Sequence, residues 1–264
     1  MTYDEYTKLN IDIKEGILTI AISNPAGKNC IDAVLHHELA RVFQKISLDD
    51  SVRVVVITGD PEGRAFCAGG DLKWMRDDIN TAEDLAEMVR DGAAIVNSLL
   101  EIRQPVIAMI NGHAVGLGAT IALLADVSFM SAKAVISDPH VNVGIVAGDG
   151  GALLWPLLIG PNRAKEFLMT GDPINAEQAA NIGLVNHCVD ADALEETAMT
   201  FAKRLATGPR MAIELTKKSV NLMLKQLGTQ LVPASLALET ITFTTADHKE
   251  AVRAFLAKET PKFS

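Results

Sequence analysis

Two glycine-rich segments are the first candidates for chemistry in this chain of 264 residues. They are residues 63–72 (GRAFCAGGDL) and 111–118 (NGHAVGLG), and each follows a predicted strand. The second leads into an apolar stretch, 119–125, that is predicted to be helical. Free backbone N–H groups at a helix start can converge on a developing negative charge. Glycines also serve tight turns and close packing, so spacing alone leaves both interpretations open.

Other common signatures are incomplete. Gly116 and Gly118 lack the full spacing of a dinucleotide-binding motif, and no GK[ST] of a phosphate-binding loop follows them. The chain also has no GxSxG motif, which would mark a nucleophilic serine. His37 and Glu38 begin an HExxH-like pattern, but Arg41 stands where the second histidine must be. The three cysteines are far apart, which predicts reduced thiols rather than disulfides or zinc ligands. We therefore expect no metal and no nucleotide cofactor.

The elements that must position these segments alternate between strands and helices. Short β-branched runs bounded by turn residues predict strands. A helix is expected after Asp32, and another from Thr81, where Thr81 and Asp84 can form a capping box. This alternation predicts an α/β fold. The predicted strands are 17–22, 53–58, 105–110, 126–130 and 184–189.

The last part of the chain has a different pattern. After about Asp192, strand-like runs give way to long helical stretches with apolar stripes, one of them at Leu194, Ala198, Phe201 and Leu205. We expect a core domain over residues 1–191 and a helical domain over 192–264, with the helices packed on the core or on another subunit.

Composition narrows the class of protein. The formal charge of −9 argues against a protein built mainly to bind nucleic acid or an anionic membrane, and 48% apolar residues exclude disorder. No apolar run approaches the ~20 residues that span a bilayer. The first residues lack the apolar core of a secretory signal, so a cytoplasmic location is the default expectation.

Four ordered motifs carry a resemblance to a known family. FCAGGDL at 66–72, NGHAVGLG at 111–118, DPHVNVGIVAGDGG at 138–151 and GLVNHCV at 183–189 together resemble the crotonase (enoyl-CoA hydratase/isomerase) superfamily, over essentially the whole chain. The resemblance implies a spiral of ββα units followed by helices that form a trimer, or a hexamer made of two trimers. It also implies an acyl-CoA substrate, with CoA part of the substrate and no separate cofactor.

The resemblance further implies an oxyanion hole that holds the thioester oxygen as it becomes an enolate. The donors map to the backbone N–H groups of Ala68 and Leu117. Leu117 replaces the glycine common at this position, but a backbone donor needs no particular side chain. Loss of one such donor typically costs ~3 kcal/mol of barrier.

The acid/base positions depart from the hydratase pattern. Thr120 and His140 stand where hydratases of the superfamily place two glutamates. Thr120 cannot act as a carboxylate base, whereas His140 can. Asp149 could orient the His140 ring or merely cap the helix expected near Gly150. The His…GIVxGDG pattern is similar to that of crotonase-fold C–C hydrolases, which cleave β-diketones by a retro-Claisen reaction.

The family pattern also suggests CoA contacts. Arg64 and Lys28 would lie near the phosphates or adenine, with surface salt bridges as the alternative. The backbone of Ala65, Asp71 and Leu72 would line the CoA pocket, and Phe255 and Lys258 would reach the CoA of a neighbouring subunit. Trp74, Met75, Trp155 and Leu158 are candidates for the acyl pocket, and His36, His37 and His248 are expected to face solvent on helices.

Three functions remain open. The first is an acyl-CoA enzyme of the hydratase/isomerase type that uses His140, with Asp149, in place of the glutamates. The second is hydrolytic C–C cleavage of a β-dicarbonyl, free or as a CoA ester. The third is a non-catalytic CoA-ligand-binding protein, against which the retained His140 and Asp149 count.

Overall fold

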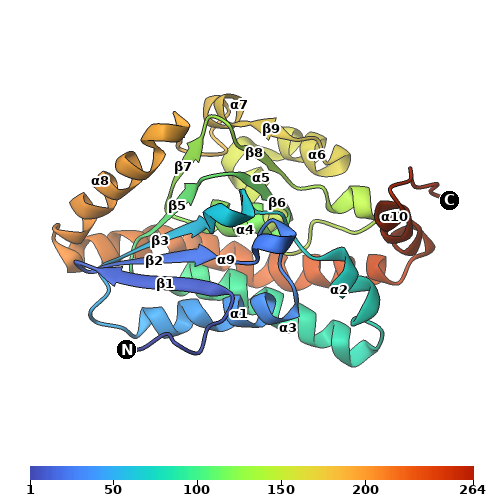
Figure 1. The fold of residues 1–264 in the computed structure, drawn as a ribbon, viewed down its shortest axis with the longest axis horizontal. Helices are drawn as coiled ribbons and strands as arrows, with labels where there is room; N and C mark the ends of the chain where they lie inside the picture. The colour runs from blue at the N-terminus through green and yellow to red at the C-terminus, as the bar shows by residue number, and fades with distance from the viewer.

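The computed structural model describes residues 1–264 and contains two sheets with helices packed around them (Figure 1). The larger sheet has the order β1-β2-β3-β5-β7-β10, in which only the β1–β2 pair is antiparallel. The smaller sheet has the order β4-β6-β8-β9, with β8 and β9 antiparallel. Their strands are β1 Leu9–Lys14, β2 Ile17–Ile22, β3 Val54–Gly59, β5 Val106–Ile110, β7 Val127–Ser131 and β10 His187–Val189 in the first, and β4 Ala65–Cys67, β6 His113–Val115, β8 Val135–Ser137 and β9 Ile174–Asn175 in the second.

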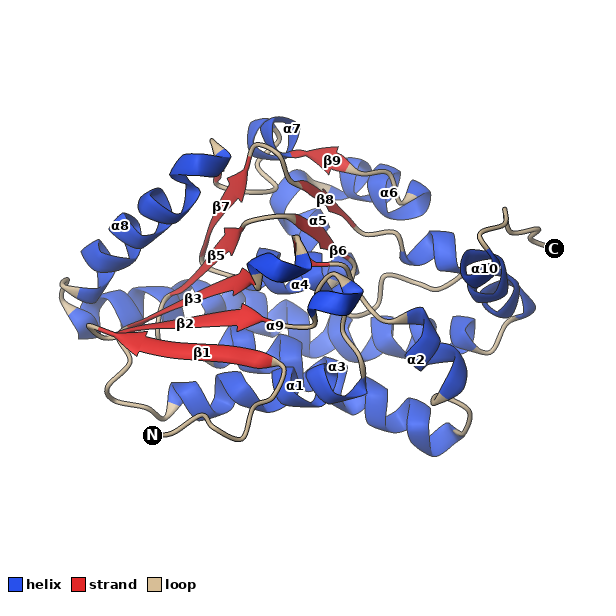
Figure 2. Cartoon of the chain, in the orientation of Figure 1, coloured by secondary structure: helices blue, strands red, loops and turns tan.

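From β3 to β8, successive strands alternate between the two sheets. β3, β5 and β7 lie in the larger sheet, and each is followed along the chain by a strand of the smaller sheet. A helix follows each of these strand pairs, which is the expected ββα arrangement and confirms the predicted α/β class (Figure 2). The helices are α1 Ala33–Ser47, α2 Leu72–Asp77, α3 Ala82–Glu101, α4 Leu117–Leu124, α5 Gly151–Ile159, α6 Pro161–Thr170, α7 Ala176–Asn181, α8 Leu194–Ala206, α9 Arg210–Phe243 and α10 Ala246–Ala257.

Both faces of the larger sheet are covered, because alternate residues of a strand point to opposite faces. Val55 and Ile57 of β3 belong to the main core, which includes the apolar faces of α1 and α3. Val54 and Val56 point the other way, into a second cluster with α8.

The predicted capping box at the start of α3 is present, with Asp84 N–H donating to Thr81 Oγ1 and the Asp84 side chain accepting from the Thr81 backbone.

The apolar stripe of α8 lies on the sheet of its own chain. Leu194 and Ala198 are buried, and Phe201 and Leu205 pack against the same cluster. This stripe is therefore not available to another subunit. Apolar side chains are instead exposed along α9, the long helix that runs behind the sheet in Figure 1, and they are Met211, Leu215, Val220, Leu222, Met223, Leu231, Leu238 and Ile241.

The C-terminal helices close over the core near its catalytic candidates. α9 packs along α3 and α5, and α10 lies against α2 and the turn that begins at His140. The division between residues 1–191 and 192–264 stays a prediction. None of the helices combines the length and the hydrophobicity that a membrane span requires.

Candidate active site

His140 lies between two carboxylates. It begins the short 3₁₀ helix His140–Val143 that follows β8. Its Nδ1 pairs with Oδ1 of Asp138, and its Nε2 lies 3.4 Å from Oδ2 of Asp149. All three residues are buried. Asp138 was missed by sequence reasoning, although its position two residues before His140 is the signal that could have identified it.

Asp149 faces the histidine rather than capping a helix. The N-cap of α5 is Gly150, and this helix has no side-chain cap. The second carboxylate oxygen of Asp149 accepts a hydrogen bond from Thr120 Oγ1 at 3.3 Å. The capping interpretation is therefore wrong, and the structure brings His140 and Asp149 together.

The charges of this cluster set the protonation of His140. Burial alone would lower the pKa of the ring, but Asp138 and Asp149 outweigh it and raise the pKa well above its ordinary value. A histidine with a carboxylate at each ring nitrogen is held in one orientation, and its charged form is stabilised.

Glu239 of α9 adds a third carboxyl group, which sequence reasoning also missed. Its side chain is buried, and Oε2 has no hydrogen-bond partner. Burial and the negative charge of Asp149 raise the pKa of Glu239 to about 8, against the opposing effect of His140. The buried site therefore favours the protonated, uncharged form of Glu239. The sequence did contain a signal for it: Glu239 is the one charged residue between Leu231 and Phe243, and a lone charge in such a stretch is a candidate functional residue.

The two glycine-rich segments each contain one of two adjacent parallel strands, because Cys67 of β4 pairs with Ala114 of β6. Gly69 and Gly116 both have positive φ, +85° and +55°, which glycine adopts without strain. The Ala68 N–H makes no backbone hydrogen bond within the chain. Leu117 is the first residue of α4, so its N–H has no acceptor inside the helix.

Two hollows meet at this cluster. The outer pocket, of about 510 Å³, and the inner cavity, of about 40 Å³, share Gly70, Met75 and His140. Of the residues predicted for the site, the outer pocket is lined by Lys28, Ala68, Asp71, Leu72, His140 and Phe255, and the inner cavity by Leu117, His140 and Asp149.

The structure brings only some of the predicted CoA contacts to the outer pocket. Arg64, Ala65 and Lys258 line neither hollow, so their contact with CoA stays a prediction. Phe255 lines the pocket of its own chain, although it was expected to reach a neighbour. Asp71 caps α2 by accepting from Lys73 N–H.

Four further expectations about side-chain position are corrected or refined. His36 and His248 are buried rather than facing solvent, whereas His37 is exposed. Trp155 is fully buried in the core, where it packs on Phe167. Leu158 is exposed. Of the four candidates for the acyl pocket, only Trp74 and Met75 line the inner cavity.

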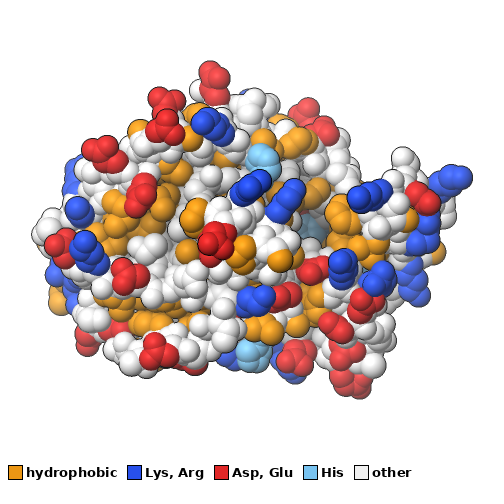
Figure 3. Space-filling model, in the orientation of Figure 1, with side chains coloured by type: hydrophobic (Ala, Val, Ile, Leu, Met, Phe, Trp, Pro, Cys, Tyr) orange, Lys and Arg blue, Asp and Glu red, His pale blue; other side chains and the backbone are white.

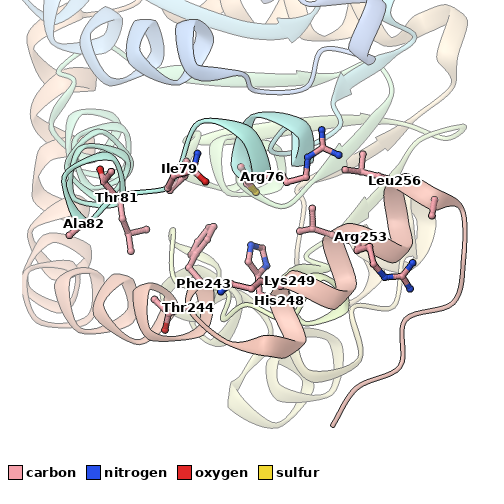
Figure 4. A pocket seen from close by; sticks show the side chains of 15 residues that line it. Arg76, Ile79, Thr81, Ala82, Phe243, Thr244, His248, Lys249, Arg253 and Leu256 are labelled. Carbon is pink, nitrogen blue, oxygen red and sulfur yellow. The ribbon is translucent and has the colours of Figure 1, made fainter.

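A third hollow lies beside the inner cavity. This groove, of about 810 Å³, runs between the α2–α3 segment and the α9–α10 segment (Figure 4). Phe243 and His248 point into it from the α9–α10 segment, with Ile79 on the opposite wall. Met75 and Phe243 line both the groove and the inner cavity, so these two side chains separate them.

Possible metal ligands are already engaged with one another. Ligand atoms of Asp138, His140 and Asp149 lie within 4.8 Å of each other, but each ring nitrogen of His140 faces a carboxylate. The arrangement suits proton transfer between buried groups.

Comparison with known proteins assigns the family. Residues 12–264 match the model of the enoyl-CoA hydratase/isomerase family. The chain is 33% identical over 258 residues to 1,2-epoxyphenylacetyl-CoA isomerase of Escherichia coli K12, covering 96% of each chain. It is 31% identical over 262 residues to 2,3-dehydroadipyl-CoA hydratase of the same strain, covering 97% of this chain and 98% of that one. A crystal structure of an enoyl-CoA hydratase/isomerase from Mycobacterium paratuberculosis superposes with a TM-score of 0.90 at 37% identity, covering 95% and 99% of the two chains.

The fold and the family match define an α/β enzyme of the crotonase fold. The chain belongs to the enoyl-CoA hydratase/isomerase family, and the two curated relatives named above are, by name, enzymes of CoA esters.

Proposed function

We propose that this protein converts an acyl-CoA by way of a thioester enolate, with His140 as the proton-transfer group. The observation that carries this proposal is the position of His140, which lies between two buried carboxylates and lines both hollows. The Ala68 and Leu117 N–H groups would hold the enolate oxygen, because both lack intramolecular acceptors at the ends of adjacent segments.

Each polar group has a distinct part in this mechanism. Neutral His140 removes a proton through Nε2 while Asp138 holds its Nδ1, and the imidazolium later returns a proton to the enolate. In a hydration, the proton comes from water, the hydroxide adds to the β-carbon, and the enolate takes up a proton at the α-carbon. In an isomerisation, one proton leaves one carbon and returns to another. Asp149 stabilises the imidazolium, and protonated Glu239 can donate into the same cavity.

The outer pocket would receive the CoA portion. Lys28 lines it, and on the face shown in Figure 3 Lys and Arg side chains gather to the right of centre, where the surface is hollowed. Phosphate groups favour such cationic surroundings. The acyl end would enter the inner cavity past Met75. Arg64 and Lys258 would act at the rim, and exposed apolar side chains on α9 support association into a trimer or a hexamer.

The second candidate is hydrolysis of a C–C bond in a β-dicarbonyl. The dyad of His140 and Asp149 favours it, since the hydratase-type glutamates are absent. His140 would take a proton from water, and the hydroxide would add to one carbonyl carbon. The C–C bond then breaks, the electron pair leaves as an enolate held by the two N–H groups, and the imidazolium protonates that carbon. The products are a carboxylic acid and a ketone, joined when the substrate is cyclic.

A panel assay distinguishes these functions. The purified protein is incubated with crotonyl-CoA, a 3-enoyl-CoA and a cyclic β-diketone, and hydration, isomerisation and ring opening are followed by absorbance. Turnover of a CoA ester that disappears in His140→Ala supports the first function, and ring opening supports the second. If the protein binds CoA esters but converts none of the three, the non-catalytic function is favoured instead.

A further inference from the structure

His36 is a buried histidine whose side chain has no partner. It lies on α1, its relative exposure is 6%, and neither ring nitrogen makes a hydrogen bond within the chain. Neither ring nitrogen is among the fully enclosed polar atoms that lack partners, so the ring retains access to free space. His36 lines the inner cavity together with His140, Asp149 and Glu239.

The His36 ring is held in place by its neighbours. Trp74 lies beside it with the ring centroids 5.4 Å apart and the planes at 45°. Gly92 of α3 leaves room next to Nε2, because even an added Cβ there would be 3.9 Å from this atom. The ring is thus packed on one side and open on another.

His36 is uncharged at neutral pH. Burial lowers the pKa of its ring to about 4, despite the opposing charges of Asp91 and Asp149. A neutral imidazole carries one donor and one acceptor nitrogen. Leaving such a group unpaired in a buried site is costly, so a ligand that pairs with it binds more strongly.

The rest of the cavity wall offers a substituent few polar contacts, among them the indole N–H of Trp74, which can donate but not accept. Apart from His36 and the three proposed acid/base groups, the wall consists of glycine, apolar, aromatic and thioether side chains. A hydrocarbon acyl group would satisfy this wall but would leave His36 unpaired. An acyl group carrying one hydroxyl or keto oxygen would satisfy both.

We propose that His36 is a specificity-determining residue that hydrogen-bonds an oxygen substituent of the substrate, so that the preferred substrates are oxygenated acyl groups rather than plain hydrocarbon chains. This inference rests on the proposed acyl-CoA function of the same site. Selection by a buried hydrogen-bonding group is strong, because the analogue that lacks the oxygen leaves the group unpaired.

Binding of unreactive esters tests the inference without relying on turnover. Butyryl-CoA is compared with 4-hydroxybutyryl-CoA, and pentanoyl-CoA with 5-hydroxypentanoyl-CoA, by calorimetry. The wild type should bind at least one hydroxylated ester about tenfold or more tightly than its partner. His36→Leu should remove this preference and keep the affinity for the plain esters, and His36→Gln should restore part of it. His37→Leu is the matched control, since His37 is the exposed neighbour and pairs with Asp91 on the surface.

The outcomes separate this inference from the function on which it rests. Equal affinities within both pairs for the wild type, or a preference that survives in His36→Leu, overturns it. If no CoA ester binds at all, the acyl-CoA function fails, and a cyclic 1,3-diketone and the matching monoketone take the place of the esters. A preference for the diketone that His36→Leu abolishes then supports the role of His36, and equal binding rejects it.

Discussion

Glu239 and His140 line one buried cavity, although they come from the C-terminal helix α9 and from the turn after β8. The cavity therefore combines a protonated carboxyl group from one part of the chain with a carboxylate-flanked histidine from another. Groups whose pKa values are shifted by burial and by each other are typical of acid/base sites.

Removal of the histidine should abolish most of the activity. We expect His140→Ala to lower kcat by ~10²–10⁴, with little change in ligand affinity. Asp149→Asn should lower kcat less, since Asp149 orients and stabilises the ring. Thr120→Ala should lower kcat least of the three, because Thr120 has no ionisable group to lose and its hydroxyl only donates to Asp149. Steady-state kinetics and calorimetry check this, and undiminished turnover in His140→Ala would remove His140 from the mechanism.

The Asp138 carboxylate should set the pH dependence of kcat/KM. Because Asp138 and Asp149 raise the pKa of His140 and the neutral ring is the base, kcat/KM should rise with pH above 6.5 until that raised pKa is passed. Asp138→Asn removes one charge and should move this rise to lower pH by about one unit or more. Asp77→Asn, on the surface, should leave the profile unchanged. A profile that does not move in Asp138→Asn would contradict the pairing with Nδ1.

Glu239 should make the fold less stable in alkali. Its pKa is higher in the folded protein than in the unfolded chain, so the folded state binds more protons between pH 4.5 and about 8. The contribution of Glu239 to the free energy of unfolding should fall as pH rises through this window, by up to ~1.4 kcal/mol per unit, whereas His36, whose pKa is lowered, acts in the opposite direction below pH 6.5. Glu239→Gln should lose this contribution, so its free energy of unfolding should fall less with pH than that of the wild type. Chemical denaturation from pH 5 to 8 measures it, with exposed Glu195→Gln as the control, and identical slopes for wild type and Glu239→Gln would disprove it.

CoA should stabilise the protein. Binding to the folded state alone raises Tm with ligand concentration. Lys28→Gln should weaken this shift, since Lys28 lines the outer pocket, whereas Lys14→Gln on β1 should not. Differential scanning fluorimetry with CoA and crotonyl-CoA provides the measurement. An absent shift with both ligands would favour a free β-dicarbonyl substrate.

The protein should assemble into a trimer or a hexamer. The exposed apolar side chains of α9 would be covered in such an assembly. Light scattering at micromolar concentration measures the mass, and Leu222→Glu on this face should dissociate the assembly, while Glu195→Gln on α8 should not. A monomeric wild type would contradict the prediction.

The elements were largely predictable, because periodicity and capping are local properties of the sequence. The helix from Thr81 and the strand around Val55 lie where these patterns indicated. For His36, the periodicity of the helix was misinterpreted. It shares the helical face of Leu39, Ala40 and Phe43, which are all buried, so its spacing indicated burial and its polarity was given too much weight.

Only the part of the site that lies within one sequence motif could be predicted. His140 and Asp149 lie in one motif, and their short separation in the chain suggested a contact that the structure contains. Glu239 reaches the same cavity only because α9 crosses the core there. No local pattern contains that crossing, since it depends on how distant segments pack.

Because α9 supplies one wall of the inner cavity, any ligand held there bridges the C-terminal helix and the core. Local unfolding of α9 would expose Glu239 and remove one wall of the inner cavity, while the sheets remain folded. The slowest-exchanging amides of α9 should then report occupancy, with substrate analogues extending their hydrogen-exchange lifetimes more than those of the sheet strands. Catalytic competence would thus be a property of a smaller cooperative unit than the whole fold.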